Sequence, residues 1–316
     1  MTIGRVCGQR RSFENAPIQQ GAFDKCIIAD ECRVAVGPLC LSVVSQDLDF
    51  LNHFRYYYGR SIVVHPADLE VIVKVRRKLA PNRITKSLAV YRKEASRLEG
   101  AGFSLYDGLI SGRADLENRC CEIDVEAALL AGEHLPLFQD LLFKDLVYHL
   151  GKKNYGQNEA KAFVMHGCAV AHAAKGFLFL GPSGRGKTTI ARLSQKDVVL
   201  HDEAVYVSSR QERYFIESMP HASDIKNLGN SRIQLRAVFF LSHGDTNDVV
   251  RLAGSAAAAK AVRLISPPLP MDGVSRGRII EEMLGFACAA SKAVPFFNLQ
   301  FSNRDNSFWE LIDANC

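Results

Sequence analysis

Short apolar runs separated by polar turns fill much of the first half of the chain, which is typical of a protein rich in β-strands. Five of these runs predict strands, over residues 32–37, 40–44, 61–65, 69–75 and 121–125. Helical spacing is clear between Leu137 and Leu150, where apolar residues recur every three or four positions and Gly151 follows as a stop. The first half is therefore predicted to form a small β-rich α+β domain.

The second half shows longer apolar runs, as expected for buried strands. An apolar run over 162–171 turns at 172–176 and returns over 177–180, which predicts a hairpin. Further strands and a hairpin are predicted over residues 198–203, 204–208, 214–217, 235–241 and 296–301. Helices are predicted over residues 256–259 and 276–292, the second capped by Ser275.

A glycine-rich loop follows the 177–180 strand and fits the phosphate-binding pattern G-x-x-x-x-G-K-[ST] at every fixed position. Glycines allow the backbone to turn its N–H groups toward phosphate oxygens, and the helix that begins at Lys187 adds a positive dipole end. Lys187 can reach the β- and γ-phosphates, and the Thr188 hydroxyl is a ligand for Mg²⁺. The predicted nucleotide-binding residues are Gly181, Pro182, Ser183, Gly184, Arg185, Gly186, Lys187, Thr188 and Thr189.

Two carboxylates end the next predicted strand, at Asp202 and Glu203. Acids at the end of a strand close to a magnesium nucleotide can hold the metal or accept the proton of a substrate hydroxyl. His166 lies in the run that precedes the loop, and the hairpin would bring it near the nucleotide. Asp202, Glu203 and His166 are therefore candidate catalytic or metal-binding residues, although a histidine in an apolar strand can also be an ordinary core residue.

Composition limits the classes of function. The chain has 316 residues and 47% hydrophobic residues, enough for two domains, and its net charge of +5 does not indicate nucleic-acid binding. Nine cysteines without a C-x-x-C pair favour free thiols over zinc or disulfides. No apolar run is long enough to span a membrane, and no signal peptide precedes the first domain, so the expected location is the cytoplasm.

Basic residues concentrate between Lys74 and Glu99, which is either a solvated face or a patch that docks an acidic peptide. We take Arg76, Arg77 and Lys78 as candidate substrate contacts from this segment. Lys226, in a polar loop after the fifth strand of the second half, is a further candidate. The predicted organisation is a loose arm over 1–25, an α+β domain over 26–155 for substrate recognition, and a nucleotide domain over 156–316.

The loop, the Asp202–Glu203 pair and His166 together resemble the HPr kinase family, in particular its HPr-kinase-related members. The resemblance covers roughly residues 160–316. It is carried by residues 165–170, 179–189, 200–205, 220–226, 236–241 and 294–301.

This resemblance implies a phosphoenolpyruvate-carboxykinase-like nucleotide domain of the α/β class, with a mixed sheet, that uses ATP and Mg²⁺ to phosphorylate a serine hydroxyl. It places Asp202 at the catalytic acid/base position, Glu203 beside it and His166 at the mouth of the site; related proteins are commonly homo-oligomers. The glycine- and arginine-rich segment that engages HPr has no counterpart here, so the expected acceptor is another protein or peptide. A small-molecule kinase and a non-transferring nucleotide-binding regulator or ATPase remain alternatives.

Overall fold

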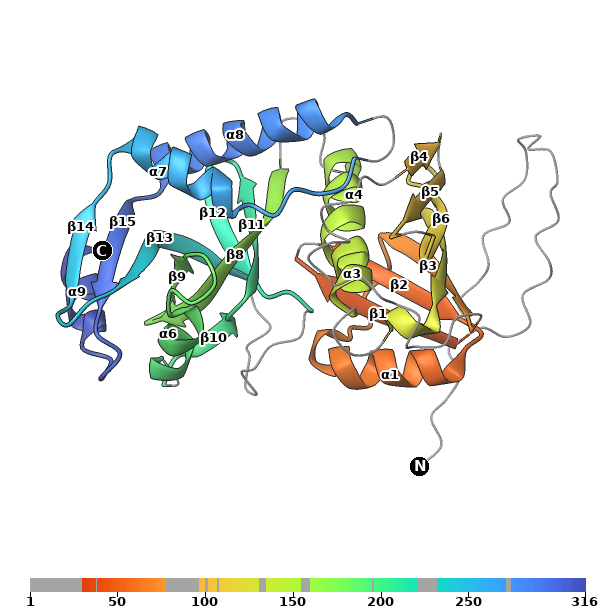
Figure 1. Ribbon diagram of the computed structural model, residues 1–316, viewed down its shortest axis with the longest axis horizontal. Coiled ribbons are helices and arrows are strands. Elements are labelled where there is room, and N and C mark those ends of the chain that lie inside the picture. The colour runs from red at the N-terminus through yellow and green to blue at the C-terminus, as the bar shows by residue number, and fades with distance from the viewer. Residues whose placement is uncertain are drawn as a thin grey trace.

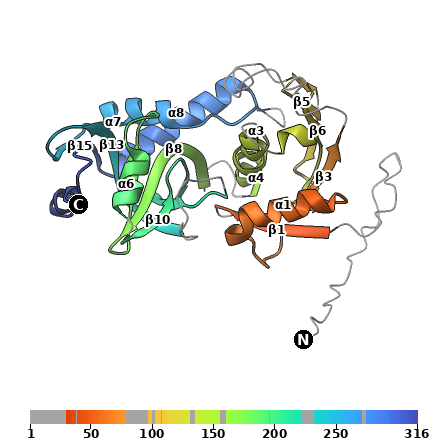
Figure 2. The same cartoon turned by 60° about the horizontal axis from the view of Figure 1, so that its bottom comes forward.

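The computed structural model describes residues 30–37, 39–77, 97–99, 102–106, 108–130, 135–154, 160–194, 196–220, 232–270 and 274–316. Within them the fold is α/β, with two mixed sheets on either side of a central helical segment (Figure 1; Figure 2). The predicted arm over 1–25 and the candidate residues Lys78 and Lys226 lie outside the described residues. No helix in these ranges combines the length and the apolar character needed to cross a membrane.

The first sheet is mixed and has seven strands. In spatial order they are β1 (Asp30–Val36), β2 (Leu39–Ser45), β3 (Leu69–Arg76), β7 (Cys120–Glu126), β6 (Ile110–Asp115), β5 (Gly102–Leu105) and β4 (Arg97–Glu99). Strands β2, β3 and β7 are parallel neighbours, and the other pairs are antiparallel. Four of the five predicted strands of the first half are thereby confirmed.

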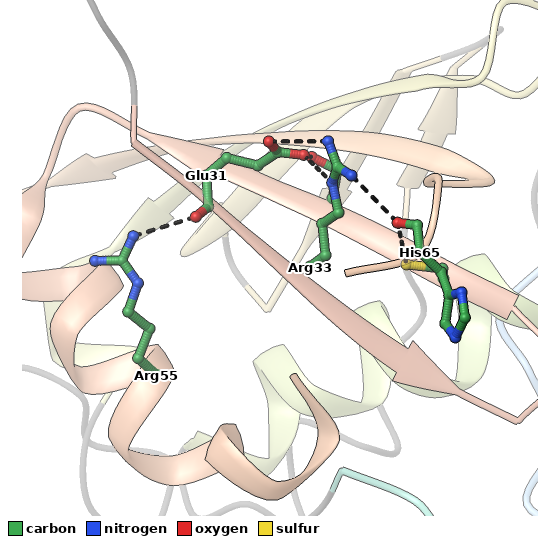
Figure 3. Close-up of polar contacts among 6 residues, drawn as sticks. Glu31, Arg33, Arg55 and His65 are labelled. Atoms are coloured by element: carbon green, nitrogen blue, oxygen red, sulfur yellow. Dashed lines mark hydrogen bonds and ion pairs between the residues drawn. The ribbon is translucent and has the colours of Figure 1, made fainter. Parts of the chain in front are cut away.

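The two faces of the first sheet differ because side chains alternate along each strand. One face is apolar and packs against helix α1 (Leu48–Tyr58) and the helical segment 135–154. The other face carries a polar network in which Arg33 and Ser42 both donate hydrogen bonds to the Glu31 carboxylate (Figure 3). The bonds from Arg33 lower the pKa of Glu31 below its ordinary value. This open face is therefore held by charge-assisted hydrogen bonds among its own side chains.

The strand predicted over 61–65 is wrong. Residues Gly59–Ser61 form a 3-10 turn, and a single bridge joins Ile62 to Val34 of β1. The Val64 side chain is 92% exposed, so the apolar residues of this run do not mark a buried face. Pro66 follows and has no N–H to extend a ladder. The segment lies along the edge of β1, where the Arg33 side chain donates to the His65 carbonyl (Figure 3).

The central helical segment joins the two halves of the molecule. It comprises α3 (Leu135–Asp140), a π-helical segment (Leu141–Leu146) and α4 (Val147–Asn154), so the predicted 137–150 helix is confirmed and the π-helical geometry is additional. On its second-half side, Asp145 Oδ1 accepts the Leu269 N–H at 3.0 Å, and His149 Nε2 lies 2.7 Å from the Leu269 carbonyl oxygen. The backbone N–H and carbonyl groups of Leu269 are thus held by two side chains one helical turn apart.

Asp145 is fully buried, and its Oδ2 has no hydrogen-bond partner among the described residues. Burial raises the pKa of Asp145 to about 7, with Asp140 adding to the rise and Lys144 opposing it. Between about pH 4 and pH 7 the folded protein keeps a proton that the unfolded chain has lost. The free energy of unfolding should therefore fall as pH rises through this window and stay lower above it.

We expect Asp145→Asn to remove this contribution, because asparagine keeps an acceptor for the Leu269 N–H and carries no charge. At pH 8 the variant should be more stable than wild type, with an upper bound of about 4 kcal/mol, and at pH 4 the two should be similar. Urea unfolding at both pH values measures the difference. Asp248→Asn, at an exposed carboxyl, is the control; equal pH dependence of wild type and Asp145→Asn would contradict the assignment.

The second sheet has eight strands. They are β8 (Ala160–His172), β9 (Lys175–Leu180), β10 (Val198–His201), β11 (Ala204–Arg210), β12 (Arg213–Glu217), β13 (Arg232–His243), β14 (Asp248–Arg251) and β15 (Phe296–Phe301). Helices α7 (Gly254–Ala261) and α8 (Arg276–Ala293) contribute to the core on one face, and α6 (Lys187–Leu193) and α9 (Phe308–Asn315) to the core on the other. The predicted hairpins, strands and helices of this half are confirmed, except that β10 ends at His201, two residues before the predicted end. Strand β14 and helix α9 are additional.

Strand directions place four strand ends at one edge of this sheet. Strands β9, β13 and β15 are parallel neighbours, and β8 runs antiparallel to β9. Because β10 is also antiparallel to β8, it points the same way as β9. The carboxyl ends of β9, β10, β13 and β15 therefore meet at a common edge, the position where open α/β sheets bind ligands.

Candidate functional site

The glycine-rich loop leaves the edge directly from the last residue of β9, Leu180, and leads into α6. Gly184 and Gly186 have φ values of 79° and 93°, in the left-handed region that favours glycine. A Cβ on Gly186 would lie 2.5 Å from Phe301 Cζ, whereas a Cβ on Gly184 would meet no atom within 4 Å. The loop is thus packed on its sheet side at Gly186 and open at Gly184.

All nine predicted nucleotide-binding residues lie in this loop and in the first turn of α6. Pro182, Ser183, Gly184 and Arg185 are exposed, and Thr188 is half-buried. Lys187 is only 4% exposed, and its ammonium group donates to the carbonyl oxygens of Gly181 and Pro182 at 3.1 and 3.2 Å. The Lys187 side chain therefore folds back over the loop that precedes it in the sequence.

The charge of Lys187 is held in a partly desolvated place. Burial lowers the pKa of Lys187 below its ordinary value, and Glu203, Cys168 and Asp202 act against that shift. A desolvated ammonium group is stabilised by an anion that enters the site, such as a phosphate group.

The register of β8 explains how these segments come together. On one side of β8, Gly167 pairs with Leu180, the residue before the loop. On the other side, His166 pairs with Ala204, and the Gly167 N–H donates to the Glu203 carbonyl oxygen at 3.1 Å. Two strand spacings, about 10 Å, thus separate the start of the loop from the Asp202–Glu203 turn.

The two adjacent carboxylates differ in exposure. Asp202 is 3% exposed, whereas the Glu203 side chain is 51% exposed and its Oε1 lies 3.3 Å from His166 Nδ1. The structure thus brings His166, Lys187, Asp202 and Glu203 to the same region. The described residues contain no cluster of three His, Cys, Asp or Glu side chains arranged for a metal, so the Mg²⁺ ligands remain a prediction.

His201 is a residue of this site that the sequence analysis did not single out. It is fully buried at the end of β10, and its Nδ1 accepts the N–H groups of Glu203 and Ala204 at 3.0 and 3.1 Å. An Nδ1 that accepts two hydrogen bonds carries no proton, so its 4.0 Å approach to Asp202 is not an ion pair. The imidazole instead fixes the backbone of the carboxylate turn. A polar residue that ends an apolar strand just before two acids was the available signal.

We expect His201→Leu to lower the free energy of unfolding by about 1–3 kcal/mol, since it leaves two partly buried N–H groups without this acceptor. His201→Asn is the matched control, because the Asn Oδ1 can occupy the place of Nδ1 and accept the same bonds. Urea denaturation compares the two variants with wild type. Equal stability of the Leu and Asn variants would show that these two hydrogen bonds do not hold the turn.

His243 is a second residue that the sequence analysis missed. It ends β13, its ring lies 5.3 Å from that of Phe301, and its Nε2 is 3.1 Å from the Gly184 carbonyl oxygen. The carbonyl can only accept, so Nε2 carries the proton in this contact. His243 therefore holds a carbonyl of the glycine-rich loop from the neighbouring strand end. The signal was a polar residue after the buried 235–241 run.

The predicted basic substrate residues that are described lie on the first sheet, away from this edge. Arg76 donates to the carbonyl oxygens of Gly108 and Leu109 and pairs with Glu126 at 3.4 Å. Arg77 pairs with Asp47 at 2.6 Å. Arg76 thus has structural partners within its own sheet, and Arg77 is exposed beside α1.

A comparison with known protein families identifies the family of this chain. The model of the family described as SynChlorMet cassette protein ScmC matches residues 144–315. The chain belongs to this family. The matched residues of this ScmC family member begin within the central helical segment and include the glycine-rich loop, the carboxylate turn and both histidines that hold them.

Comparisons with solved structures and with curated proteins gave two further findings. The solved structure of the Hpr(Ser) kinase/phosphatase from Coxiella burnetii aligns with a TM-score of 0.20 and 10% identity, covering 39% of this chain and 88% of that one. A TM-score this low carries no argument about fold or activity. No curated protein matches this ScmC family member.

Proposed function

We propose that this ScmC family member is an ATP-dependent kinase that transfers the γ-phosphoryl group to a hydroxyl, most simply that of a serine, in a peptide or protein other than HPr. One observation carries the proposal: the β8 register sets the glycine-rich loop and the Asp202–Glu203 turn on either side of one strand, at the same level. A carboxylate opposite a phosphate-binding loop can accept the proton of an attacking hydroxyl or hold Mg²⁺, and both roles serve phosphoryl transfer.

The residues present fit a magnesium nucleotide. The loop has two glycines with positive φ, an open side at Gly184 and a helix N-terminus beyond it, which together suit bound phosphate. Lys187 would exchange its bonds to loop carbonyls for phosphate oxygens, and the Thr188 hydroxyl would be a metal ligand. Bound Mg-ATP would supply the phosphoryl group and the charge that neutralises it.

Asp202 would accept the proton of the attacking hydroxyl. Its burial keeps the carboxylate away from bulk water, and the turn that holds it is fixed by His201 and by the Gly167 N–H. Glu203, which is more exposed and lies beside His166, would hold the water shell of the metal or orient the acceptor. Positioning and electrostatics supply most of the rate enhancement in phosphoryl transfer, and these residues provide both.

The test is incubation of the full-length protein and Mg-ATP with candidate acceptors encoded beside its gene, followed by mass spectrometry. A mass increase of one phosphate on an acceptor serine, with Lys187→Ala as the inactive control, supports the proposal. Release of ADP without a modified acceptor identifies an ATPase. Binding of nucleotide without turnover identifies a regulator, and phosphorylation of a small molecule alone identifies a different kinase class.

A further inference from the structure

A cavity of about 210 Å³ lies on the helix-covered side of the first sheet, between α1, the end of β3 and the start of α3. Its floor is formed by the buried rings of Phe50, Phe54, Tyr58 and Phe138. These rings contact one another edge to face or tilted, with centroids 4.5–5.9 Å apart, so the floor is a packed aromatic surface. An apolar cavity of about 150 Å³ is enough to bind benzene, so this one has room for a larger ring.

The mouth of the cavity is polar and exposed. His53, Tyr57 and Arg77 line it, and the Arg77 side chain is 60% exposed. Arg77 Nη2 is held by Asp47 at 2.6 Å and lies 3.9 Å from Asp49. Within the part of the chain that the structure describes, Arg77 Nε and Nη1 have no hydrogen-bond partner. Among the described residues, the guanidinium is therefore anchored at the rim through Nη2, and its other donors have no partner there.

The charges of Asp47 and Asp49 determine which kind of ligand group Arg77 can bind at the mouth. Two carboxylates already neutralise the guanidinium, so a further anion would gain little. A neutral acceptor such as a peptide carbonyl can still take the unused N–H groups. Beyond the mouth, α1 exposes the ring of Tyr56, which is 84% exposed and lies 5.6 Å from that of Tyr57. A ligand that continues past the cavity would contact this ring.

We infer that this cavity binds an aromatic side chain of a peptide, with the adjacent backbone carbonyl hydrogen-bonded to Arg77. The ring matches the aromatic floor, the carbonyl matches the free donors, and the rest of the peptide matches the exposed face of α1. The inference extends the proposed function to docking of the acceptor. It stands apart from phosphoryl transfer, because binding at the cavity requires no nucleotide.

The test uses N-acetyl-L-tryptophanamide, which carries a ring and two carbonyls, and full-length protein without nucleotide. We expect one saturable site by calorimetry and ligand-observed NMR, with a Kd on the order of 1 mM. Arg77→Gln should weaken binding about tenfold, the effect of one hydrogen bond from a charged donor. Arg113→Gln, at an exposed arginine on the open face of the same sheet, should leave it unchanged. N-acetyl-L-serinamide, which has no ring, should not bind.

A second variant guards against binding elsewhere on the surface. Ala127 lines the cavity, so Ala127→Phe should fill it from the wall and abolish binding, with the fold checked by circular dichroism. Absence of saturable binding to wild type, or equal binding to Ala127→Phe, would overturn the inference. Indole that binds wild type as tightly as the amide, with no loss in Arg77→Gln, would identify a site for small aromatic molecules and overturn the peptide assignment. Loss of phosphoryl transfer with binding intact would concern the proposed function alone.

Discussion

Asp202→Asn should slow phosphoryl transfer by about 10²–10⁴-fold, the range for loss of a positioned general base, while nucleotide affinity stays nearly unchanged. Asparagine has the shape of aspartate and can keep the hydrogen bonds of a buried side chain, but it cannot take a proton from the acceptor. The measurement is single-turnover transfer from labelled ATP to the identified acceptor. Nucleotide binding is measured by calorimetry on the same preparations.

Glu203→Gln is the matched control for Asp202→Asn, because it removes one charge from the same turn. Its loss of rate should be smaller, since the Glu203 side chain is half exposed beside His166 and is assigned to the water shell of the metal or to the acceptor rather than to the proton. Two adjacent acids titrate as a coupled pair, so a pH–rate profile reports the pair and not either residue. Full transfer by Asp202→Asn would refute its role as the base. A binding loss as large as the rate loss would make Asp202 a metal-site residue.

The elements of the second half were predictable because their signals are local. The hairpin that leads into the loop, the loop pattern and the capped helix α8 each depend on residues adjacent in the chain. The structure adds non-glycine turn residues with positive φ at Ala173 and Ala174, which tighten the first hairpin without a glycine at its tip. Strand β14 and helix α9 escaped prediction because they are only four and eight residues long.

The secondary structure of the first half was less predictable because the positions of its apolar residues depend more on tertiary packing than on local sequence patterns. Helix α1 was missed because five aromatic residues in its eleven positions favour strands by propensity, yet Phe50, Phe54 and Tyr58 recur at helical spacing and are buried. The 61–65 run has the β-branched residues of a strand, but it makes only a single bridge to β1 before Pro66. The sequence therefore indicated the β-rich class and misplaced one strand.

The residues of the candidate site also divide into those with a local sequence signal and those without one. Lys187, Asp202 and His166 were found because they lie in or next to recognisable patterns. His201 and His243 act through backbone groups of other segments, and those contacts exist only once β8 and β13 are in register. The partners of Arg77, Asp47 and Asp49, lie about thirty residues earlier in the chain, so no local pattern could reveal that its charge is largely neutralised.

Lys187→Ala and Thr188→Ala should weaken binding of Mg-nucleotide by different routes. Lys187→Ala removes the charge that faces the phosphates and the bonds that close the loop over Gly181 and Pro182, so a loss of about 10²-fold is expected with or without Mg²⁺. Thr188→Ala removes only a metal-directed hydroxyl, so it should lose the Mg²⁺-dependent part of the affinity and keep the rest.

Lys187→Arg and Thr188→Ser are the controls, since they keep the charge and the hydroxyl. Calorimetric titration of ATP with and without Mg²⁺ separates the two effects, and circular dichroism checks the fold. The Ser variant should bind nearly as wild type, whereas the Arg variant should bind better than Lys187→Ala because a cation still faces the phosphates. Unchanged affinity in both alanine variants would remove the phosphate-binding role of the loop. The roles of Asp202 and Glu203 would lose their basis with it, because both depend on a nucleotide held on the other side of β8.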